Sequence, residues 1–541
     1  MLNLYKLFIL FVQLFFCSVQ GDLIVNTKYG KVQGIKTEFG QAFLGIPYAQ
    51  PPVGSLRWQA PVEPIPWQST YNATQLKPGC PQHGCFATNP AFVCPSETSE
   101  SCLFLNVWTP EPSPGPVETF PVMLYIHGGN FVHMSSSSPI FRGDYFANKG
   151  KVILVTFDYR LGDRFYAELY GALGFLYTGP SPDDARGNYG IQDQLLAMKW
   201  VQENIKNFGG DPTRVTLFGQ SAGAQSVSIH LMSESTSSLF RNVIIESSPF
   251  DIPMKSPVEA LYLASLVKKF LNCTTKEYMH CLRSKTAEEI AQAQLDARAE
   301  PTSLKLLEFF EPLGPFVDGK IVPYEPIDAI QKGRIRNVPT IIGTVSEEAR
   351  IFVYEAWGKP LTTAEYAAVM LATYPTHMPE ILLKYPPSKT GDSRDVLTKV
   401  GTDFIFTCAA RNMTRNFIKT NPDVYRYIFS QSFSFDGWGN FTYCEGHVCH
   451  GEEIAFVFHS ADQSGFNFNK GEETLSNTMI GYWTNFAYTS DPGRGPHQID
   501  VIWPKYDSIH KSMKFLIPND IIVTDYEQEF CDFWDTIGYK A

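Results

Sequence analysis

The stretch that decides the fold is Arg214-Val-Thr-Leu-Phe-Gly219-Gln-Ser221-Ala-Gly223-Ala-Gln-Ser-Val-Ser-Ile-His230. Residues 215–218 predict a strand, and the small residues after the serine predict the start of a helix. A strand that runs through Gly-x-Ser-x-Gly into a helix is typical of a nucleophile elbow, where a sharp turn exposes the serine, here Ser221. The alternative interpretation is a tight turn with an idle serine.

Outward from this stretch, apolar runs at residues 122–126, 152–157, 243–245 and 340–342 alternate with helical patterns such as 192–207 and 257–271. Alternating strands and helices predict an α/β fold, a mostly parallel central sheet with helices on both faces. No repeat or long linker divides the chain, so we expect one domain over residues 21–541.

The composition limits the classes of partner. Of 541 residues, 44% are hydrophobic and 14% aromatic, and the net charge is −11. The chain can therefore bury a large core, which excludes intrinsic disorder. The acidic balance offers no basic surface to phosphates, so we expect no nucleic-acid partner.

The N-terminus predicts a signal peptide over residues 1–20. Lys6 precedes an apolar run at 7–16, and Cys17, Ser18 and Gly21 follow. No other stretch reaches the roughly 20 apolar residues of a transmembrane helix, so we expect no transmembrane segment. These features predict the secretory pathway, with a secreted or vesicle-lumen protein as the product.

Cysteines and glycosylation motifs fit an oxidising compartment. Ten cysteines remain after position 20, an even number, as a set of disulfides requires. Asn-x-Ser/Thr motifs predict glycosylation at Asn72, Asn272, Asn412 and Asn440.

A serine nucleophile needs a base, an acid that orients the base, and donors for the oxyanion. The donors are expected in His127-Gly128-Gly129-Asn130-Phe131, an HGGG-like loop directly after a predicted strand. In α/β-hydrolases the acid and then the histidine follow the serine along the chain.

Further phrases resemble the type-B carboxylesterase family, which includes the cholinesterases, over nearly the whole mature chain. They are Phe43-Leu-Gly-Ile-Pro-Tyr-Ala, Glu100-Ser-Cys102-Leu-Phe-Leu-Asn-Val-Trp, Gly187-Asn-Tyr-Gly-Ile-Gln-Asp193-Gln, Asn207-Phe-Gly-Gly-Asp-Pro, Tyr482-Trp-Thr-Asn-Phe-Ala and Cys531-Asp-Phe-Trp-Asp. The resemblance implies the α/β-hydrolase fold and hydrolysis of a small-molecule ester, with no cofactor.

The resemblance also implies the remaining site residues. In Ile341-Ile-Gly-Thr-Val-Ser-Glu347-Glu348 the acid matches Glu348, with Glu347 as the fallback, and in His450-Gly-Glu-Glu-Ile the base matches His450. The alternative for either glutamate is a solvated loop charge. The oxyanion donors are then the backbone N–H groups of Gly129, Asn130 and Ala222.

Cys444, His447, Cys449 and His450 together have the donor types of a zinc site. We expect no metal, because an oxidising lumen favours a disulfide between the two cysteines and a ligated His450 could not act as a base.

The family correspondence implies the disulfides Cys273–Cys281, Cys408–Cys531 and Cys80–Cys102, beside Cys444–Cys449. Cys85 and Cys94 would pair inside the loop closed by Cys102, although four cysteines allow three connectivities. The resemblance further implies two buried ion pairs, Arg57 with Glu100 and Arg160 with Asp193.

Departures from the family suggest the substrate class. Asn130 replaces a Gly or Ala, and Gln220 replaces the Glu that usually precedes the nucleophile. Residues 80–102 contain Phe86 and Phe92 but no Trp that could bind a quaternary ammonium. We therefore expect a general carboxylic ester rather than a choline ester. The role of an insertion at 163–171 is not predicted.

The main alternative is a weakly active or inactive relative. Adhesion-type members of the superfamily keep the fold without a working triad, and crystal-type members of social amoebae are storage-like. The presence of Ser221, Glu348 and His450 argues against adhesion but does not exclude storage. The sequence does not predict the oligomeric state.

Overall fold

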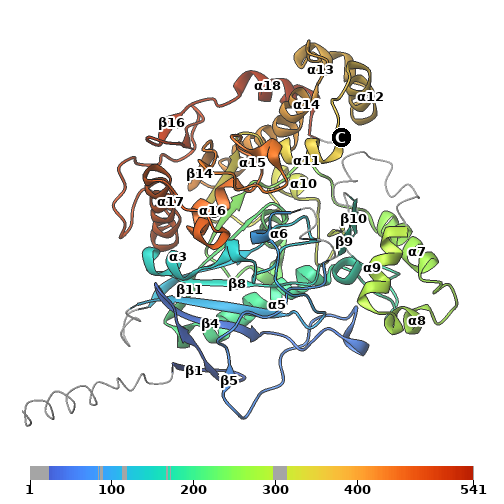
Figure 1. The fold of residues 1–541 in the computed structure, drawn as a ribbon, viewed down its shortest axis with the longest axis vertical. Coiled ribbons are helices and arrows are strands. Elements are labelled where there is room, and N and C mark those ends of the chain that lie inside the picture. The colour runs from blue at the N-terminus through green and yellow to red at the C-terminus, as the bar shows by residue number, and fades with distance from the viewer. Residues whose placement is uncertain are drawn as a thin grey trace, which may run out of the picture.

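A large mixed sheet forms the centre of the protein, here a computed structural model (Figure 1). The structure describes residues 23–82, 85, 89–111, 119–161, 163–165, 168–170, 172–296 and 314–539. The predicted signal peptide, residues 1–20, lies outside the described residues, as does Phe86. The sheet has 11 strands in the order β16-β15-β14-β13-β12-β11-β7-β8-β6-β4-β3.

The middle of this sheet is parallel from β8 to β15, and its two edges are antiparallel. The strands are β3 (Ile35–Lys36), β4 (Gly40–Pro47), β6 (Phe104–Pro110), β7 (Phe120–Ile126), β8 (Ile153–Phe157), β11 (Gly210–Gln220), β12 (Asn242–Glu246), β13 (Thr340–Val345), β14 (Val424–Phe429), β15 (Ser512–Phe515) and β16 (Ile521–Val523). The α/β prediction is thus confirmed, and every predicted strand lies within or beside one of these.

Helices pack on both faces because side chains alternate along the strands. On β7, Val122, Leu124 and Ile126 belong to a core shared with α5 (Tyr189–Asn204), α6 (Ala222–Met232) and α15 (Cys408–Phe417). Met123 and Tyr125 point to the other core, which α3 (Asp144–Gly150), α16 (Glu452–Phe458) and α17 (Lys470–Thr489) complete. Both faces are therefore dry, as a mostly parallel sheet requires.

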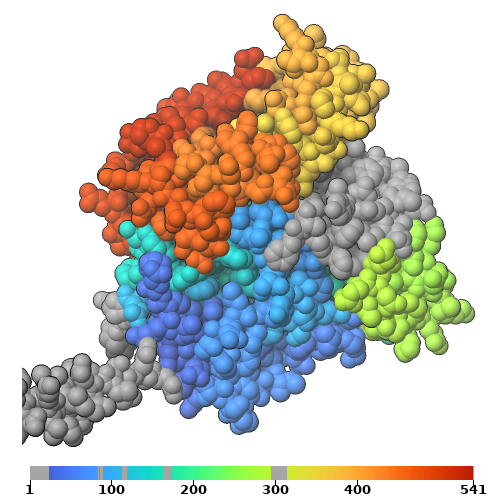
Figure 2. Space-filling model, viewed as in Figure 1, coloured from blue at the N-terminus to red at the C-terminus, as the bar shows by residue number. Residues whose placement is uncertain are grey.

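Smaller groups of elements surround this centre. Helices α7 (Pro257–Phe270), α8 (Tyr278–Ser284) and α9 (Ala287–Asp296) gather at one side, and α12 (Thr363–Thr373) and α13 (Met378–Lys384) at another (Figure 1). The remaining α-helices of the described residues are α4 (Ala172–Phe175), α10 (Pro326–Gln331), α11 (Arg350–Ala356), α14 (Arg394–Gly401) and α18 (Gln528–Ile537). In the view of Figure 2, the early part of the chain (blue) lies at the lower centre and the late part (orange to red) at the upper left.

Two further sheets are small. Strands β1 (Ile24–Thr27), β2 (Gly30–Gln33) and β5 (Tyr71–Asn72) form a three-stranded sheet. Strands β9 (Asp163–Phe165) and β10 (Glu168–Tyr170) form an antiparallel hairpin, which occupies the predicted insertion at 163–171.

Five disulfides join the same cysteines that the resemblance implied: Cys80–Cys102, Cys85–Cys94, Cys273–Cys281, Cys408–Cys531 and Cys444–Cys449. We call the last the His450-loop disulfide and Cys273–Cys281 the α8 disulfide. The two implied ion pairs are also present: Arg57 Nε donates to Glu100 at 2.7 Å, and Arg160 binds Asp193 through Nε and Nη2, both at 2.7 Å.

Across the part of the chain that the structure describes, no helix combines the length and the apolar character needed to cross a membrane. Among the predicted glycosylation sites, Asn72, Asn272 and Asn440 are exposed, whereas Asn412 is half-buried and accepts a hydrogen bond from Asn416. Glycosylation stays a prediction.

Candidate active site

Ser221 lies at the turn between β11 and α6, at the carboxyl end of a central parallel strand. Its backbone has φ 57° and ψ −124°, a region that non-glycine residues occupy only under strain. Its N–H donates to the Glu246 carbonyl at 2.9 Å, which ties the turn to β12. The turn thus has the geometry of a nucleophile elbow.

The two flanking glycines are required by close packing. A Cβ added at Gly219 would lie 2.7 Å from the Gly223 carbonyl carbon, and one added at Gly223 would collide with the Ile126 carbonyl oxygen. Helix α6 therefore approaches the end of β7 more closely than any side chain allows, and this holds Ser221 beside the loop that follows β7.

Glu348 follows β13 and is completely buried. Its Oε1 accepts a hydrogen bond from the Val345 N–H at 2.8 Å, and its Oε2 lies 2.5 Å from His450 Nδ1. Because the carboxylate accepts, the proton of neutral His450 sits on Nδ1, and Nε2 keeps its lone pair. This is the tautomer that a general base needs.

A backbone contact sorts the neighbouring glutamates and histidines into pairs. Glu347 and Cys449 form a parallel β-bridge, and the Glu347 N–H donates to Val448 O at 3.1 Å. Glu347 then reaches His447, with 2.8 Å between Oε2 and Nδ1, near the surface, where the His447 side chain is 38% exposed. The inner pair is Glu348 with His450 and the outer pair is Glu347 with His447.

The same loop does not have the ligands of a zinc site. The sulfurs of Cys444 and Cys449 are joined in the His450-loop disulfide, so they are not thiolates, and zinc binding by cysteine needs the thiolate. The disulfide closes its loop directly before His450, which limits the positions of that side chain.

Two aromatic rings and an amide group also contact His450. The rings of Phe352 and Phe406 each lie 5.2 Å from the imidazole. Phe406 comes from a π-helical segment, Thr402–Thr407, an arrangement found frequently at functional sites. The Gln220 amide nitrogen lies 3.1 Å from His450 Nε2 and so donates to the lone pair that would serve the serine.

The predicted oxyanion loop lies directly against the serine. A Cβ at Gly128 would stand 2.6 Å from the Gln220 carbonyl oxygen and 3.1 Å from Ser221 Cβ. Gly129 has φ 92° and Asn130 φ 58°, so Asn130 adopts the left-handed conformation that asparagine tolerates. The backbone in this region therefore accommodates the Asn.

Buried groups that the sequence did not predict hold this loop. The His127 ring stacks on Tyr159 at 4.6 Å, and its Nδ1–H donates to the Gly128 carbonyl at 2.9 Å. Burial lowers the pKa of His127 to about 4 and raises that of Asp158, which accepts from the Ser136 N–H, to about 7. A neutral His127 therefore places no positive charge next to the Gly128–Asn130 backbone.

Behind the Glu348–His450 pair lie two further buried carboxyl groups. Glu453 accepts from Ser247 Oγ at 3.1 Å, and Glu246 from the Trp483 N–H at 2.6 Å. Burial, with repulsion from Glu348 and then Glu246, raises the pKa of Glu453 to about 8, and burial raises that of Glu246 to about 8. At neutral pH both groups are therefore largely protonated and add little negative charge behind the Glu348–His450 pair.

Comparison with known proteins gives a family for this arrangement. The profile of the carboxylesterase family matches residues 21–534. The chain belongs to the carboxylesterase family. Its relatives include the cAMP-regulated D2 protein of Dictyostelium discoideum, 35% identical over 91% of this chain and 88% of that protein. The crystal protein of the same organism is 33% identical (96% and 92%), and the mouse cholinesterase is 33% identical (95% and 86%).

As a carboxylesterase family member, the protein is related to serine hydrolases of small esters, and the predicted family resemblance is confirmed. The structure brings Ser221, Glu348, His450 and the Gly129–Asn130 loop to one edge of the sheet, because all follow the carboxyl ends of parallel strands or the β-bridge beside them. The sequence analysis did not predict the buried groups Asp158, Glu246 and Glu453. Of these, Glu453 had a signal in the sequence, because it follows His450 by three residues and helix α16 carries it close to the histidine.

Proposed function

We propose that this protein is a serine esterase that hydrolyses carboxylic esters through an acyl-enzyme. The 2.5 Å contact between Glu348 Oε2 and His450 Nδ1 carries the proposal, because it fixes the imidazole tautomer at the edge of the sheet where the strained Ser221 turn lies. A turn whose serine has no catalytic role would need neither the backbone strain at Ser221 nor the buried carboxylate of Glu348.

The chemistry divides into two half-reactions. Ser221 Oγ attacks the ester carbonyl while His450 Nε2 takes its proton, and the N–H groups of Gly129, Asn130 and Ala222 bind the oxyanion. His450 then gives the proton to the leaving alcohol. Water then attacks the acyl-enzyme while His450 takes its proton. His450 returns that proton to Ser221 Oγ as the bond between Oγ and the acyl carbon breaks, and the carboxylic acid leaves.

Gln220 must yield during the first step. Its amide N–H and the Ser221 O–H are both donors to His450 Nε2, and in this structure the amide has that place. We propose that substrate entry releases the amide. A neutral hydrogen bond contributes about 0.5–1.5 kcal/mol, so its loss slows catalysis modestly rather than abolishing it.

The proposed substrates are uncharged esters. Gln220 brings no carboxylate to the site, and no Trp occurs between Cys80 and Cys102, so a choline ester gains neither charge attraction nor a Trp cation–π contact. The test is kcat/KM for butyrylcholine against its tert-butyl isostere, in wild type and Gln220→Glu, with Ser221→Ala as the blank. A wild-type preference for the cation above about tenfold, or about 1.4 kcal/mol, would refute the proposed class.

A second candidate is a storage or crystal-type protein with little activity. It is favoured by the similarity to the crystal protein and by the amide on His450 Nε2. The two functions differ in turnover: a storage protein leaves even activated esters unhydrolysed, and Gln220→Ala would then restore nothing.

We also propose that the protein enters the secretory pathway. The five disulfides and the exposed Asn72, Asn272 and Asn440 support this. N-terminal sequencing of the expressed protein should begin near Gly21, and a glycosidase should reduce its mass. An unprocessed N-terminus on the native protein would contradict the assignment.

A further inference from the structure

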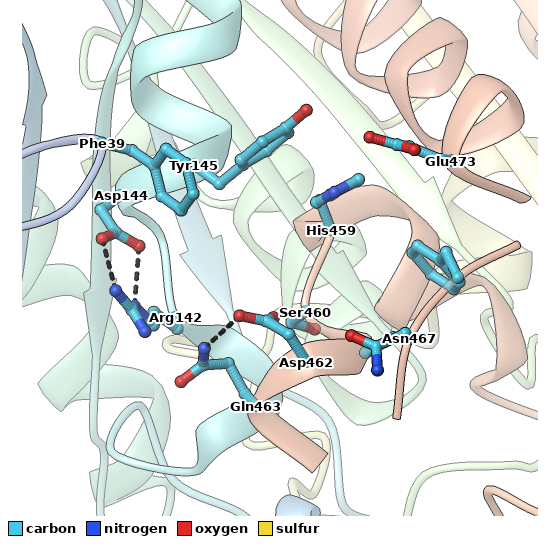
Figure 3. Close-up of a pocket in the computed structure, with 12 residues that line it drawn as sticks. Phe39, Arg142, Asp144, Tyr145, His459, Ser460, Asp462, Gln463, Asn467 and Glu473 are labelled. Atoms are coloured by element: carbon cyan, nitrogen blue, oxygen red, sulfur yellow. Dashed lines mark hydrogen bonds and ion pairs between the residues drawn. The ribbon is translucent and has the colours of Figure 1, made fainter. Parts of the chain in front are cut away.

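A pocket lies away from Ser221, at the opposite end of α16 from His450. It has a volume of about 360 Å³, which is within the range of small-molecule sites. Residues of α3, of the segment 459–468 that follows α16 and of the start of α17 line it, together with Phe39 and Arg142 (Figure 3). None of these residues takes part in the proposed ester chemistry.

One wall of the pocket is a row of rings. Tyr145 stacks on His459 with 3.9 Å between centroids and 11° between planes, Phe39 meets Tyr145 edge-on at 5.0 Å, and Phe468 meets His459 edge-on at 5.5 Å. The stack is fixed by hydrogen bonds from outside the pocket, since Tyr145 OH donates to Asn477 and His459 Nδ1 contacts Ser476 Oγ. The wall is therefore a rigid apolar surface.

The other walls are acidic. Three carboxylates line the pocket, and the single guanidinium among its lining residues, Arg142, binds one of them, Asp144, through two hydrogen bonds of 2.9 Å. Asp462 and Glu473 remain, on opposite sides of the His459 ring in Figure 3. Both act electrostatically on His459, whose pKa burial lowers, which places their charge at the aromatic wall.

A buried hydroxyl group points to a ligand independently of the charges. Ser460 lines the pocket, is 1% exposed, and its Oγ has no hydrogen-bond partner among the described residues. A buried polar atom without a partner costs free energy in the empty protein. A ligand that donates a hydrogen bond to Ser460 Oγ, once this side chain rotates to face the pocket, would remove that cost.

We propose that this pocket binds a small organic ammonium ion with an aromatic or alkyl body. The body would lie on the Tyr145–His459 wall, and the ammonium would donate to Ser460 Oγ in the field of Asp462 and Glu473. An anion of the same shape would be repelled by two carboxylates. Arg142 is already paired with Asp144, and Lys149, whose positive charge also acts on His459, acts less strongly than either carboxylate. The site is independent of the ester chemistry at Ser221.

The test is calorimetric titration of the full-length protein at low salt with phenethylammonium, its anionic counterpart 3-phenylpropionate, and neutral 3-phenylpropanol. We expect saturable binding of the amine, at least about threefold tighter than of either analogue, because exposed ion pairs contribute little each and here two act together. Absence of saturable amine binding, or equal affinity for the neutral or anionic analogue, would overturn the proposal.

Variants locate the site. Asp462→Asn with Glu473→Gln should weaken amine binding at least about threefold, whereas the matched control, Asp183→Asn with Asp500→Asn, removes the same charge from exposed positions elsewhere and should not. Ser460→Ala removes a hydroxyl that has no partner in the free protein, so it should weaken binding while leaving the thermal midpoint unchanged or higher. If the Asp462→Asn/Glu473→Gln variant and Ser460→Ala both bind the amine as tightly as the wild type does, the amine binds elsewhere and the proposal fails.

Discussion

Glu348→Gln is the substitution from which the structure predicts the largest defined effect. The Val345 N–H donates to Oε1 at 2.8 Å, so the carbonyl oxygen of the new amide must take that place. Its NH₂ group is then directed at His450 Nδ1, where Oε2 now accepts at 2.5 Å. Two donors cannot face each other, so the imidazole proton moves to Nε2 and the lone pair turns away from Ser221.

The magnitude follows from losing the correct tautomer. In a serine protease the equivalent change lowers kcat by about 10⁴-fold, which corresponds to about 5 kcal/mol of transition-state stabilisation. The shape of the side chain is unchanged, so the variant should fold. We expect the same loss here in the hydrolysis of a p-nitrophenyl ester, with KM changed little because Glu348 is buried away from the substrate.

The matched control is Glu347→Gln, next in the chain and also paired with a histidine. Its partner His447 is 38% exposed, and Glu347 is 33% exposed, so water can replace the lost contact. We expect its kcat to stay within about threefold of wild type. If Glu348→Gln keeps more than about a tenth of the activity, or Glu347→Gln loses as much, the assignment of the acid is wrong.

Three further expectations concern stability and loop geometry. Ser221→Gly should unfold at a higher denaturant concentration than Ser221→Ala. Glycine relieves about 1–3 kcal/mol of backbone strain at φ 57°, against an entropic cost of about 1 kcal/mol. A lower unfolding midpoint for the glycine variant would mean that the turn is unstrained. Glu453 has its pKa raised from 4.5 to about 8, so between these values the folded chain holds a proton that the unfolded chain lacks. The free energy of unfolding of the wild type then falls by about 1.4 kcal/mol per pH unit as pH rises. Glu453→Gln lacks this loss, so its free energy of unfolding relative to wild type should be higher at pH 8 than at pH 5. An equal difference at the two pH values would argue against a buried protonated Glu453. Replacing both cysteines of the His450-loop disulfide with serine should lower kcat. The same change in the α8 disulfide, which closes a loop of similar length away from the site, should leave kcat unchanged. Equal effects on kcat would show that the loop before His450 needs no disulfide to position the histidine.

Local sequence patterns predict those features of the protein that depend only on residues close together in the chain. The elbow at Ser221 was predictable because strand, glycine turn and helix are consecutive. The predicted strand at 215–218 was too short, since β11 begins at Gly210. The pairing with β7 shifts register between Gly210 and Val215, where Pro212 cannot donate to the ladder, and this irregular part carries no alternating pattern.

Contacts between distant segments were not predictable from patterns. Strand β14 was missed because Arg426 interrupts its apolar run, yet Arg426 is buried and donates to the Thr407 carbonyl at 3.0 Å. The Gln220 contact with His450 and the Tyr145–His459 stack depend on packing between remote elements. Glu348 and His450 were identified by family sequence segments, which also implied that they pair, and the folded chain adds the geometry of that pair.

The most direct test of the central claim is covalent labelling with a fluorophosphonate, which reacts only with an activated serine. We predict one adduct per chain by intact mass, located by peptide mapping on the peptide that contains Ser221. Ser221→Ala should abolish it, and Glu348→Gln should slow it about as much as it slows ester hydrolysis. An unlabelled wild-type protein, or an adduct that persists in Ser221→Ala, would contradict the account.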